Sequence, residues 1–529
     1  MSESINPGRD GESMVAAKAA VEEAERVQTA RRDFIKLFGY GSAGLLMGGM
    51  SIGRDGRPQL IPAAQASSDS PYNSNGEFSF DAGLLYMNIG TTGASPTRVV
   101  NDFHQDYQNL AGNPTAYFFG QQVMRNTIAR GFGCDPYELV LSFNTTDGLW
   151  RIALGIPFKA NDEIITTNME EDAGTSVLNM LKDRFGVNIK TVKIPTNDAY
   201  SDAEVLARFQ AKLTNKTKAI LFSSPIYLTG ARLPAKDLCL WAAANNLISI
   251  VDGAHLPGMV ALDLHDMGCD FFSGAGHKWQ CGPGQTGFLY IRNGFDPNPR
   301  VVQRPTIDYA PFGVPSPTVD IPVPGYSNTQ PLPTYYPTNT LIYGAAGILA
   351  NGVRNPDHNV AAVLQLVGNG SRPSQQALTE CCQMWDKWGR PAIEDYIVSL
   401  AQYLRSRIVD IWGFDALSIP YTAVADPVAR TGLTSFNPFS PNYDYNADLT
   451  AAQSKAQSSA SAAAVATLKS GYQIVIRNNS VPHTLRSKPK KNAASGTFST
   501  PLRISTHLFH STADVDRVIN ALLAVVPHP

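Results

Sequence analysis

One lysine stands in surroundings that an ordinary surface lysine does not need. Lys278 lies in the stretch FSGAGHKWQCGPGQTGFLY, between an apolar run and a loop rich in glycine, and the stretch contains no acid to pair with it. A lysine amine can form an imine with a carbonyl compound. The setting therefore makes Lys278 a candidate for such chemistry.

An acid and a histidine follow a second apolar run, in ISIVDGAHLPG, where Asp252 ends the run and His255 comes shortly after. A buried carboxylate is costly unless a cation or a strong donor meets it. Asp252 is also suited to cap the start of a helix. Because the next apolar run leads to His277 and Lys278, two successive strands would deliver an acid and a lysine to one sheet edge.

A third candidate site lies where ELVLSFNTTDGLWRIALG changes from a strand to a helix, with Thr145 and Thr146 at the helix start. Free N–H groups, two hydroxyls and the positive end of the helix dipole together favour an anion. Threonine is also common as an ordinary helix cap. Taken alone, this segment leaves both interpretations open.

The elements that must position these residues begin near Tyr86. Apolar runs alternate with amphipathic stretches; the runs cover 163–167, 218–223, 247–252, 270–274 and 287–291, and the stretches cover 203–213 and 235–246. This alternation predicts an α/β fold with a mostly parallel sheet covered by helices on both faces. Ligand sites in such sheets lie at the carboxyl ends of the strands.

The remaining chain predicts a second, smaller domain. Helical patterns at 341–352 and 390–412 precede a strand and a helix within 502–526. We expect a large domain over residues 67–340 and a small α+β domain over 341–529. Two stretches look like insertions, the proline-rich 304–337 and 437–500, and the second holds a Ser/Ala-rich tract that favours either a helix or a flexible loop.

Composition limits the classes of function. The 529 residues include 17% charged residues and carry a net charge of −2, which is typical of a large globular protein and offers no electrostatic case for nucleic acid. The six cysteines are scattered mostly through apolar stretches and do not suggest a disulfide framework.

The first 66 residues resemble a twin-arginine export signal. Arg31 and Arg32 precede Asp33, then come a glycine-rich apolar run and Ala64-Gln65-Ala66. The alternatives are an amphipathic leader or a retained anchor helix. The G-x-G-x-x-G match at 39–44 is no dinucleotide fingerprint, because no strand precedes it. We therefore expect a bacterial protein that the twin-arginine machinery exports to the periplasm or the exterior.

Together the three candidate sites fit one cofactor. A phosphate at a helix start, an acid beside a ring nitrogen and a lysine that forms an imine are what pyridoxal 5'-phosphate (PLP) requires. The chain resembles fold-type I PLP-dependent enzymes of the class V aminotransferase family, in particular the isopenicillin N epimerase-like branch. The matching stretches are YMNIGTTGASP, NTTDG, DGAH, GHKW, GPGQTGFLYIR and LRISTHLFHSTADVDRVINAL. The resemblance implies an aspartate aminotransferase-like fold with a seven-stranded sheet.

The resemblance also implies catalytic roles. Lys278 would form the imine with PLP and move the α-proton of the substrate. Asp252 would pair with the pyridinium nitrogen, and His255 would face the phenolic oxygen.

Further residues would bind the cofactor or the substrate. Thr145, Thr146 and His277 would hold the phosphate, and Thr338 stands where a neighbouring subunit completes the phosphate site, which implies a homodimer. Arg503 would bind the substrate carboxylate through two parallel hydrogen bonds.

Two departures from the family pattern affect the expected site. Ala275 replaces a serine that often contacts the phosphate, a contact that Ser273 could take over. Where the family has a histidine or an aromatic residue that stacks on the cofactor ring, this chain has Glu171 or Ala173.

The expected reaction is chemistry at the α-carbon of an amino acid or an amino-acid-derived substrate, through a Schiff base, as in class V aminotransferases and epimerases. Cysteine desulfuration is disfavoured, because residues 437–502 lack the cysteine that it needs. A PLP-dependent lyase, a desulfurase-like enzyme and a non-catalytic PLP-binding module are the alternatives.

Overall fold

The computed structural model describes residues 50–52, 58–60, 70–73, 76–115, 121–136, 138–196, 200–292, 364–365, 370–419, 429–482 and 498–529. The chain divides into two compact units, Met1–Gln65 and Ala66–Pro529. In the first unit, β1 (Met50–Ile52) and β2 (Pro58–Leu60) form an antiparallel pair. The twin arginines lie outside the described residues, so the export signal stays a prediction. No helix in the described ranges is long and apolar enough to cross a membrane.

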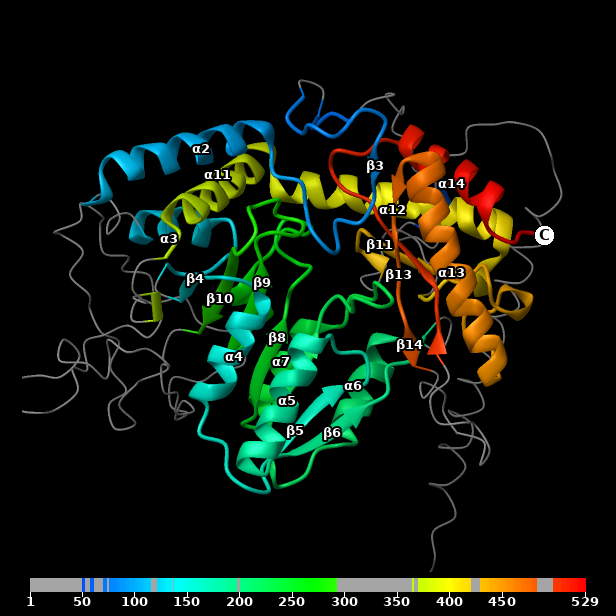
Figure 1. The fold of residues 1–529 in the computed structure, drawn as a ribbon. Coiled ribbons are helices and arrows are strands. Elements are labelled where there is room, and N and C mark those ends of the chain that lie inside the picture. Colours follow the sequence, from blue (N-terminus) through cyan, green and yellow to red (C-terminus); the bar gives the residue numbers. More distant parts are fainter. Residues whose placement is uncertain are drawn as a thin grey trace, which may run out of the picture. The chain divides into compact units, whose positions relative to one another are not determined.

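A seven-stranded sheet organises the second unit (Figure 1). Its strands, in spatial order, are β4 (Leu139–Ser142), β10 (Gly287–Ile291), β9 (Phe271–Ala275), β8 (Ile248–Asp252), β7 (Thr217–Ser223), β5 (Glu163–Thr167) and β6 (Asn188–Val192). β10 runs antiparallel to both of its neighbours, and the other pairings are parallel. The predicted mostly parallel, seven-stranded sheet is confirmed.

Helices cover both faces of this sheet. Along β7, Ala219 and Leu221 belong to one buried apolar cluster, and Ile220 and Phe222 belong to another, as the alternation of strand side chains requires. The first cluster is completed by α4 (Thr145–Gly155) and α5 (Asp172–Phe185), and the second by α6 (Asp202–Gln210) and α7 (Ala235–Ala244). Apart from the edge strand β6, the strands are therefore buried from both sides.

A smaller sheet lies near the C-terminus, with β16 (Leu502–Ser505) between β11 (Leu433–Phe436) and β13 (Arg477–Asn478), all antiparallel. The described helices outside the main sheet are α2 (Thr97–Gly112), α3 (Gln121–Arg130), α8 (Leu264–Met267), α11 (Arg372–Trp388), α12 (Arg390–Trp412), α13 (Ala451–Tyr472) and α14 (Thr512–Val525). Short strand pairs join β3 (Leu85–Tyr86) to β12 (Ile474–Val475) and β14 (Val481–Pro482) to β15 (Phe498–Ser499). Two 3-10 turns are also present, η5 (Phe414–Ala416) and η7 (Pro441–Tyr443).

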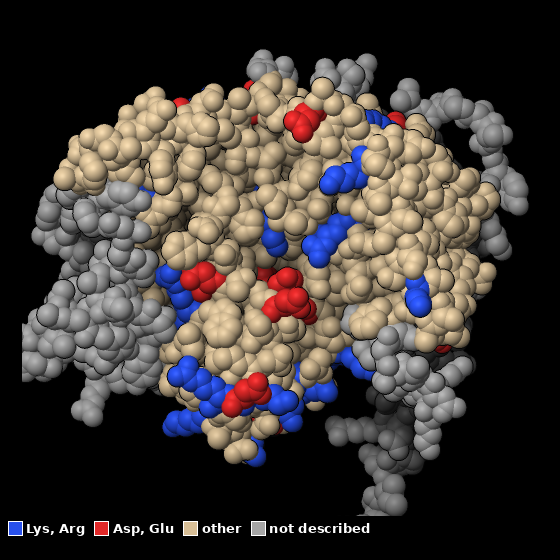
Figure 2. Space-filling model, in the orientation of Figure 1, with Lys and Arg blue, Asp and Glu red and all other residues tan. Residues whose placement is uncertain are grey.

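The structure decides whether the Ser/Ala-rich tract is a helix or a loop, but it does not test the predicted domain boundary. The Ser/Ala-rich tract forms the helix α13, which a capping box between Thr450 and Gln453 begins. The helix expected at 341–352 and the domain boundary at residue 340 lie outside the described residues, so that boundary stays a prediction. Figure 2 shows acidic and basic side chains interspersed on a mostly uncharged face.

Candidate active site

A cavity of about 250 Å³ brings together six of the eight predicted site residues. It is lined by Asn144, Thr145, Thr146, Glu171, Ala173, Ser223, Pro225, Tyr227, Asp252, Ala254, His255, Ala275, His277 and Lys278. Several of these residues end or directly follow β7, β8 and β9, so the cavity lies at the carboxyl ends of parallel strands. Of the other two predicted residues, Arg503 lies next to the cavity and Thr338 lies outside the described residues.

The acid and the lysine come from neighbouring parallel strands. Asp252 is the last residue of β8, and Lys278 follows the end of β9. Burial lowers the pKa of Lys278 to about 8, although the Asp252 carboxylate opposes that shift. Burial raises the pKa of Asp252 to about 6, although a hydrogen bond from the Ala254 N–H and the charge of Lys278 lower it. A partly neutral amine and an ionised acid therefore coexist near neutral pH.

The helix-capping alternative for Asp252 is wrong. Asp252 Oδ1 accepts a hydrogen bond from the Ala254 N–H at 3.0 Å within a turn, and the next helix, α8, begins at Leu264 with Asp263 as its cap. The carboxylate is buried at a strand end for a reason other than helix capping.

His255 presents one defined face to the lysine. Its Nδ1 accepts a hydrogen bond from the Trp279 indole N–H at 3.1 Å, and its Nε2 lies 3.5 Å from Lys278 Nζ. Burial and the charge of Lys278 hold the pKa of His255 well below its ordinary value, so the ring is neutral. An indole N–H only donates, so Nδ1 carries the lone pair and the ring proton sits on Nε2. His255 is thereby set up as a donor toward the cavity.

The start of α4 offers two threonine hydroxyls that do not cap the helix. Asn144 is the cap, because its side chain accepts a hydrogen bond from the Asp147 N–H at 2.8 Å. Thr145 is buried, and its hydroxyl has no hydrogen-bond partner among the described residues. Thr146 also lines the cavity. An unpaired buried hydroxyl at a helix N-terminus fits an anionic group such as a phosphate.

Arg503 is fixed beside the cavity by neutral acceptors. Its Nη1 donates to the Tyr227 carbonyl at 3.1 Å, and its Nη2 donates to Asn88 Oδ1 and Thr91 Oγ1, each at 3.3 Å. The side chain is 1% exposed, and its Nε has no partner in the described part of the chain. Tyr227 itself lines the cavity, so the guanidinium stands directly behind the wall.

The structure also shows the residues at the two positions where the sequence departs from the family pattern. Glu171 caps α5, because its Oε2 accepts a hydrogen bond from the Ala173 N–H at 2.7 Å, and both residues line the cavity. The Ser273 hydroxyl donates to the Thr145 carbonyl at 2.9 Å and is not part of the cavity wall, whereas Ala275 is. His277, which also lines the cavity, has a pKa lowered by burial.

Two contacts of the site could not be predicted from any sequence motif. One is the Trp279 hydrogen bond, which depends on how the turn after Lys278 folds back. The other is Gly93, whose N–H donates to the His277 carbonyl at 2.8 Å. A Cβ at Gly93 would stand 1.9 Å from the Lys278 carbonyl oxygen, so only glycine permits this approach. The stretch YMNIGTTGASP contains Gly93, but it does not identify the backbone of His277 and Lys278 as the partner.

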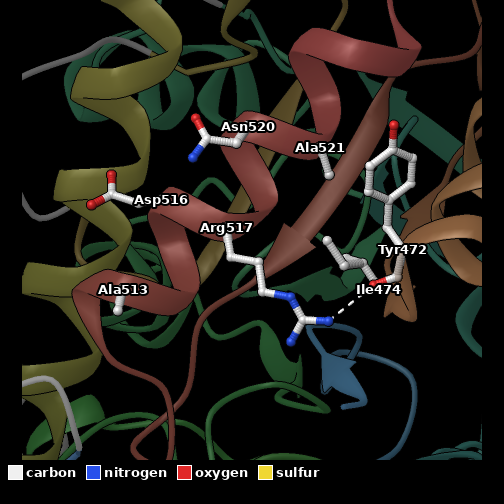
Figure 3. A pocket seen from close by; sticks show the side chains of 7 residues that line it. All are labelled: Tyr472, Ile474, Ala513, Asp516, Arg517, Asn520 and Ala521. Atoms are coloured by element: carbon white, nitrogen blue, oxygen red, sulfur yellow. Dashed lines mark hydrogen bonds between the residues drawn. The ribbon is translucent and has the colours of Figure 1, made fainter.

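A second hollow, of about 500 Å³, offers less chemistry (Figure 3). It lies between the end of α13, β12 and α14, and its Arg517 donates to the Tyr472 and Gly83 carbonyls. Asp516 points away from Arg517 in Figure 3 and pairs with Arg407. Its two charged groups are therefore already bound to the protein.

Comparisons with known proteins give one family model and several relatives. Residues 85–303 match the family model of class-V aminotransferases. The chain is 30% identical over 227 residues to isopenicillin N epimerase of Streptomyces clavuligerus, covering 42% of this chain and 56% of that protein. It is 26% identical over 225 residues to hercynylcysteine sulfoxide lyase of Schizosaccharomyces pombe, covering 40% and 56%. The chain thus matches these curated relatives over about half of their length.

Solved structures share the fold. The cystine C–S lyase C-DES in complex with cysteine persulfide has a TM-score of 0.59 at 20% identity and covers 84% of this chain and 99% of its own. The apo cysteine desulfurase from Thermococcus onnurineus NA1 has a TM-score of 0.60 at 17% identity, with coverages of 87% and 99%. A C-DES mutant with glycine covalently linked to its PLP cofactor has a TM-score of 0.58 at 18% identity, with coverages of 83% and 96%.

These findings show the fold. The chain has the fold of fold-type I PLP-dependent enzymes, as predicted, and residues 85–303 match the class-V aminotransferase model. A solved neighbour of that fold holds PLP, in agreement with the predicted cofactor. The relatives of the chain include an epimerase, a lyase and desulfurases, so the match leaves the reaction open.

Proposed function

We propose that this chain is a PLP-dependent enzyme that acts at the α-carbon of an amino acid or an amino-acid-derived substrate. The observation that carries the proposal is the joint placement of Asp252, His255 and Lys278 around one cavity, beside the unpaired hydroxyl of Thr145. An acid, a neutral donor, an amine and an anion site are the complement that PLP requires, and each would be costly to bury without a ligand.

The protonation state of each residue determines the role that we propose for it. PLP, when bound, supplies an electron sink for the bonds at the α-carbon. Lys278, with a pKa of about 8, is partly neutral and can take or return a proton at Nζ. Asp252, with a pKa of about 6, keeps a negative charge available for the ring nitrogen. His255 offers its Nε2 proton to an oxygen acceptor.

The thiols argue against desulfuration. All six cysteines are free and buried, and none lines the cavity. Burial raises the pKa of each thiol above its ordinary value, which suppresses the thiolate that would accept sulfur. We therefore place aminotransferase or epimerase chemistry first. A PLP-dependent lyase stands second, because a C–S lyase shares the fold and the curated relatives include a sulfoxide lyase.

Spectra and isotope exchange test the proposal. Protein purified with PLP should show a visible imine band that is lost in Lys278→Ala. The holoenzyme is then incubated with a panel of amino acids in D2O, and the recovered substrates and products are identified by mass spectrometry. A missing band, or one unchanged in Lys278→Ala, contradicts the proposal. An intact band without α-deuterium uptake from any amino acid indicates a binding module instead.

Export is proposed separately, on the resemblance of the leader alone. Replacement of Arg31 and Arg32 by lysine should retain the protein in the cytoplasm of its bacterial host. Cell fractionation measures this, and unchanged export of the double variant would rule out the twin-arginine route.

A further inference from the structure

Two arginines face each other across neighbouring strands next to the cavity. β13 pairs antiparallel with β16, and in that register Arg477 is the direct partner of Arg503. Arg477 Nη1 and Arg503 Nη2 both donate to Thr91 Oγ1, each at 3.3 Å, so the two side chains lie on the same face of the sheet. Like charges directly opposite each other destabilise a strand pair. The pair therefore lowers the stability of the fold unless a negative charge balances the two arginines.

No acid in the described part of the chain forms an ion pair with Arg477 or Arg503. Their acceptors are a hydroxyl, an amide oxygen and a backbone carbonyl. Arg503 Nε has no partner among the described residues although the residue is buried. Within the described ranges, the two guanidinium groups thus meet without an ion-paired acid, which is an arrangement suited to an anionic ligand.

The two arginines differ in what remains free to bind. Arg503 is buried, and three of its five N–H groups donate to neutral acceptors, which leaves the Nε–H and one Nη1–H among the described residues. Arg477 is only half-buried, and Thr91 Oγ1 is its single acceptor among the described residues. Both charges act on the cavity, because both lower the pKa of Lys278. A monocarboxylate would balance one of the two charges and leave the other uncompensated.

We propose that Arg477 binds a second anionic group of the substrate, so that the substrate is an amino acid bearing a further carboxylate besides the one on its α-carbon. This inference rests on the proposed function and on the role that the family resemblance implies for Arg503, binding of the α-carboxylate. Thr91, which contacts both guanidiniums, sets the spacing between the two anion sites. The site then selects dicarboxylic substrates over neutral ones.

Binding of achiral acids to the holoenzyme tests this without turnover. Isothermal titration calorimetry compares succinate, glutarate and adipate with monocarboxylates of matched length, for the wild type, Arg477→Gln, Arg477→Lys and the control Arg98→Gln. Arg98 is an exposed arginine on α2 that pairs with Asp102. Thermal denaturation and the PLP band verify that each variant is folded and loaded.

One dicarboxylate length should bind to the wild type and to Arg98→Gln about 10-fold or more tightly than its monocarboxylate, as charge-assisted hydrogen bonds imply. Arg477→Gln should lose that advantage and leave monocarboxylate affinity within about twofold, and Arg477→Lys should retain part of it. Equal weakening of both acid types by Arg477→Gln would show that the arginines share one carboxylate. That result, or no preference at any length, overturns the inference. Absence of the imine band from the wild-type protein would instead contradict the proposed function.

Discussion

At the scale of single residues, the hydrogen bond from Trp279 to His255 is the contact most open to direct test. Trp279→Phe keeps an aromatic ring but removes the N–H donor, so His255 Nδ1 loses the partner that fixes its tautomer. We expect kcat to fall about 10-fold, less than the roughly 100- to 1,000-fold loss on removal of a donor that acts on the reacting atoms, because Trp279 acts only through His255. The 15N shifts of labelled His255 should move at the same time.

A matched control separates positioning from packing. The Trp412 indole N–H donates to the Pro527 carbonyl, and Trp412 is buried to a similar degree away from the cavity. Trp412→Phe should leave both kcat and the His255 resonances unchanged. If the two variants lose the same activity, Trp279 serves packing only.

The lysine also makes a prediction at the residue scale, in its pH dependence. A protonated amine is no nucleophile, so the rate of PLP recombination with apoenzyme should rise with pH through a midpoint near pH 8, the pKa of Lys278. Arg477 lowers that pKa, so Arg477→Gln should shift the midpoint upward. Stopped-flow absorbance at several pH values measures both. A midpoint near 10, the ordinary pKa of lysine, would refute the effect of burial.

At the scale of elements, the loop that carries Gly93 supports the backbone of Lys278. A methyl group at Gly93 would collide with the Lys278 carbonyl oxygen at 1.9 Å, so Gly93→Ala must displace the loop or the lysine. We expect a loss of about 1–3 kcal/mol in the free energy of unfolding, as for other overpacked sites, and weaker PLP binding. Denaturant titration and PLP titration measure the two effects.

Gly284 provides the control for that variant. It lies in the same glycine-rich stretch as Lys278, and a Cβ there meets no atom within 4 Å. Gly284→Ala should therefore change neither stability nor PLP affinity appreciably. Equal effects of the two alanines would mean that general loop stiffness, and not the close approach, matters.

At the scale of the whole molecule, the family resemblance predicts a homodimer in which Thr338 completes the phosphate site of the other subunit. Light scattering coupled to size exclusion should give twice the mass of the chain. Thr338→Ala should weaken PLP binding about 10-fold without dissociating the dimer, because one charge-assisted hydrogen bond is lost. A monomer with full PLP affinity would contradict this prediction.

Much of the fold followed from the sequence because strands that are covered on both faces are mostly apolar. The predicted strands at 163–167 and 287–291 coincide with β5 and β10. The edge strand β6 was missed, because it is only partly buried and lacks a continuous apolar run. The placement of Asp252 and Lys278 at one edge followed from the same rule, that parallel strands end together.

The rest of the site depends on contacts between distant segments, which no local pattern records. Trp279 reaches His255 only because a turn folds back, and Arg477 meets Arg503 only through the register of β13 and β16. The cap of α4 is Asn144 and not one of the two threonines after it, a choice that the sequence leaves open because Asn and Thr both favour N-cap positions. Periodicity predicts which face is buried but not which side chains meet across it.

The complete burial of the six thiols has a practical consequence. A maleimide can reach none of them while the chain keeps its packing, so the extent of alkylation counts molecules whose interior has opened. Cys281 lies in the same stretch as Lys278, whereas Cys239 lies on α7 and Cys381 on α11. The order in which these thiols become labelled would therefore report which part of the protein opens first. The native cysteines thus serve as a ready set of unfolding probes that requires no engineered label.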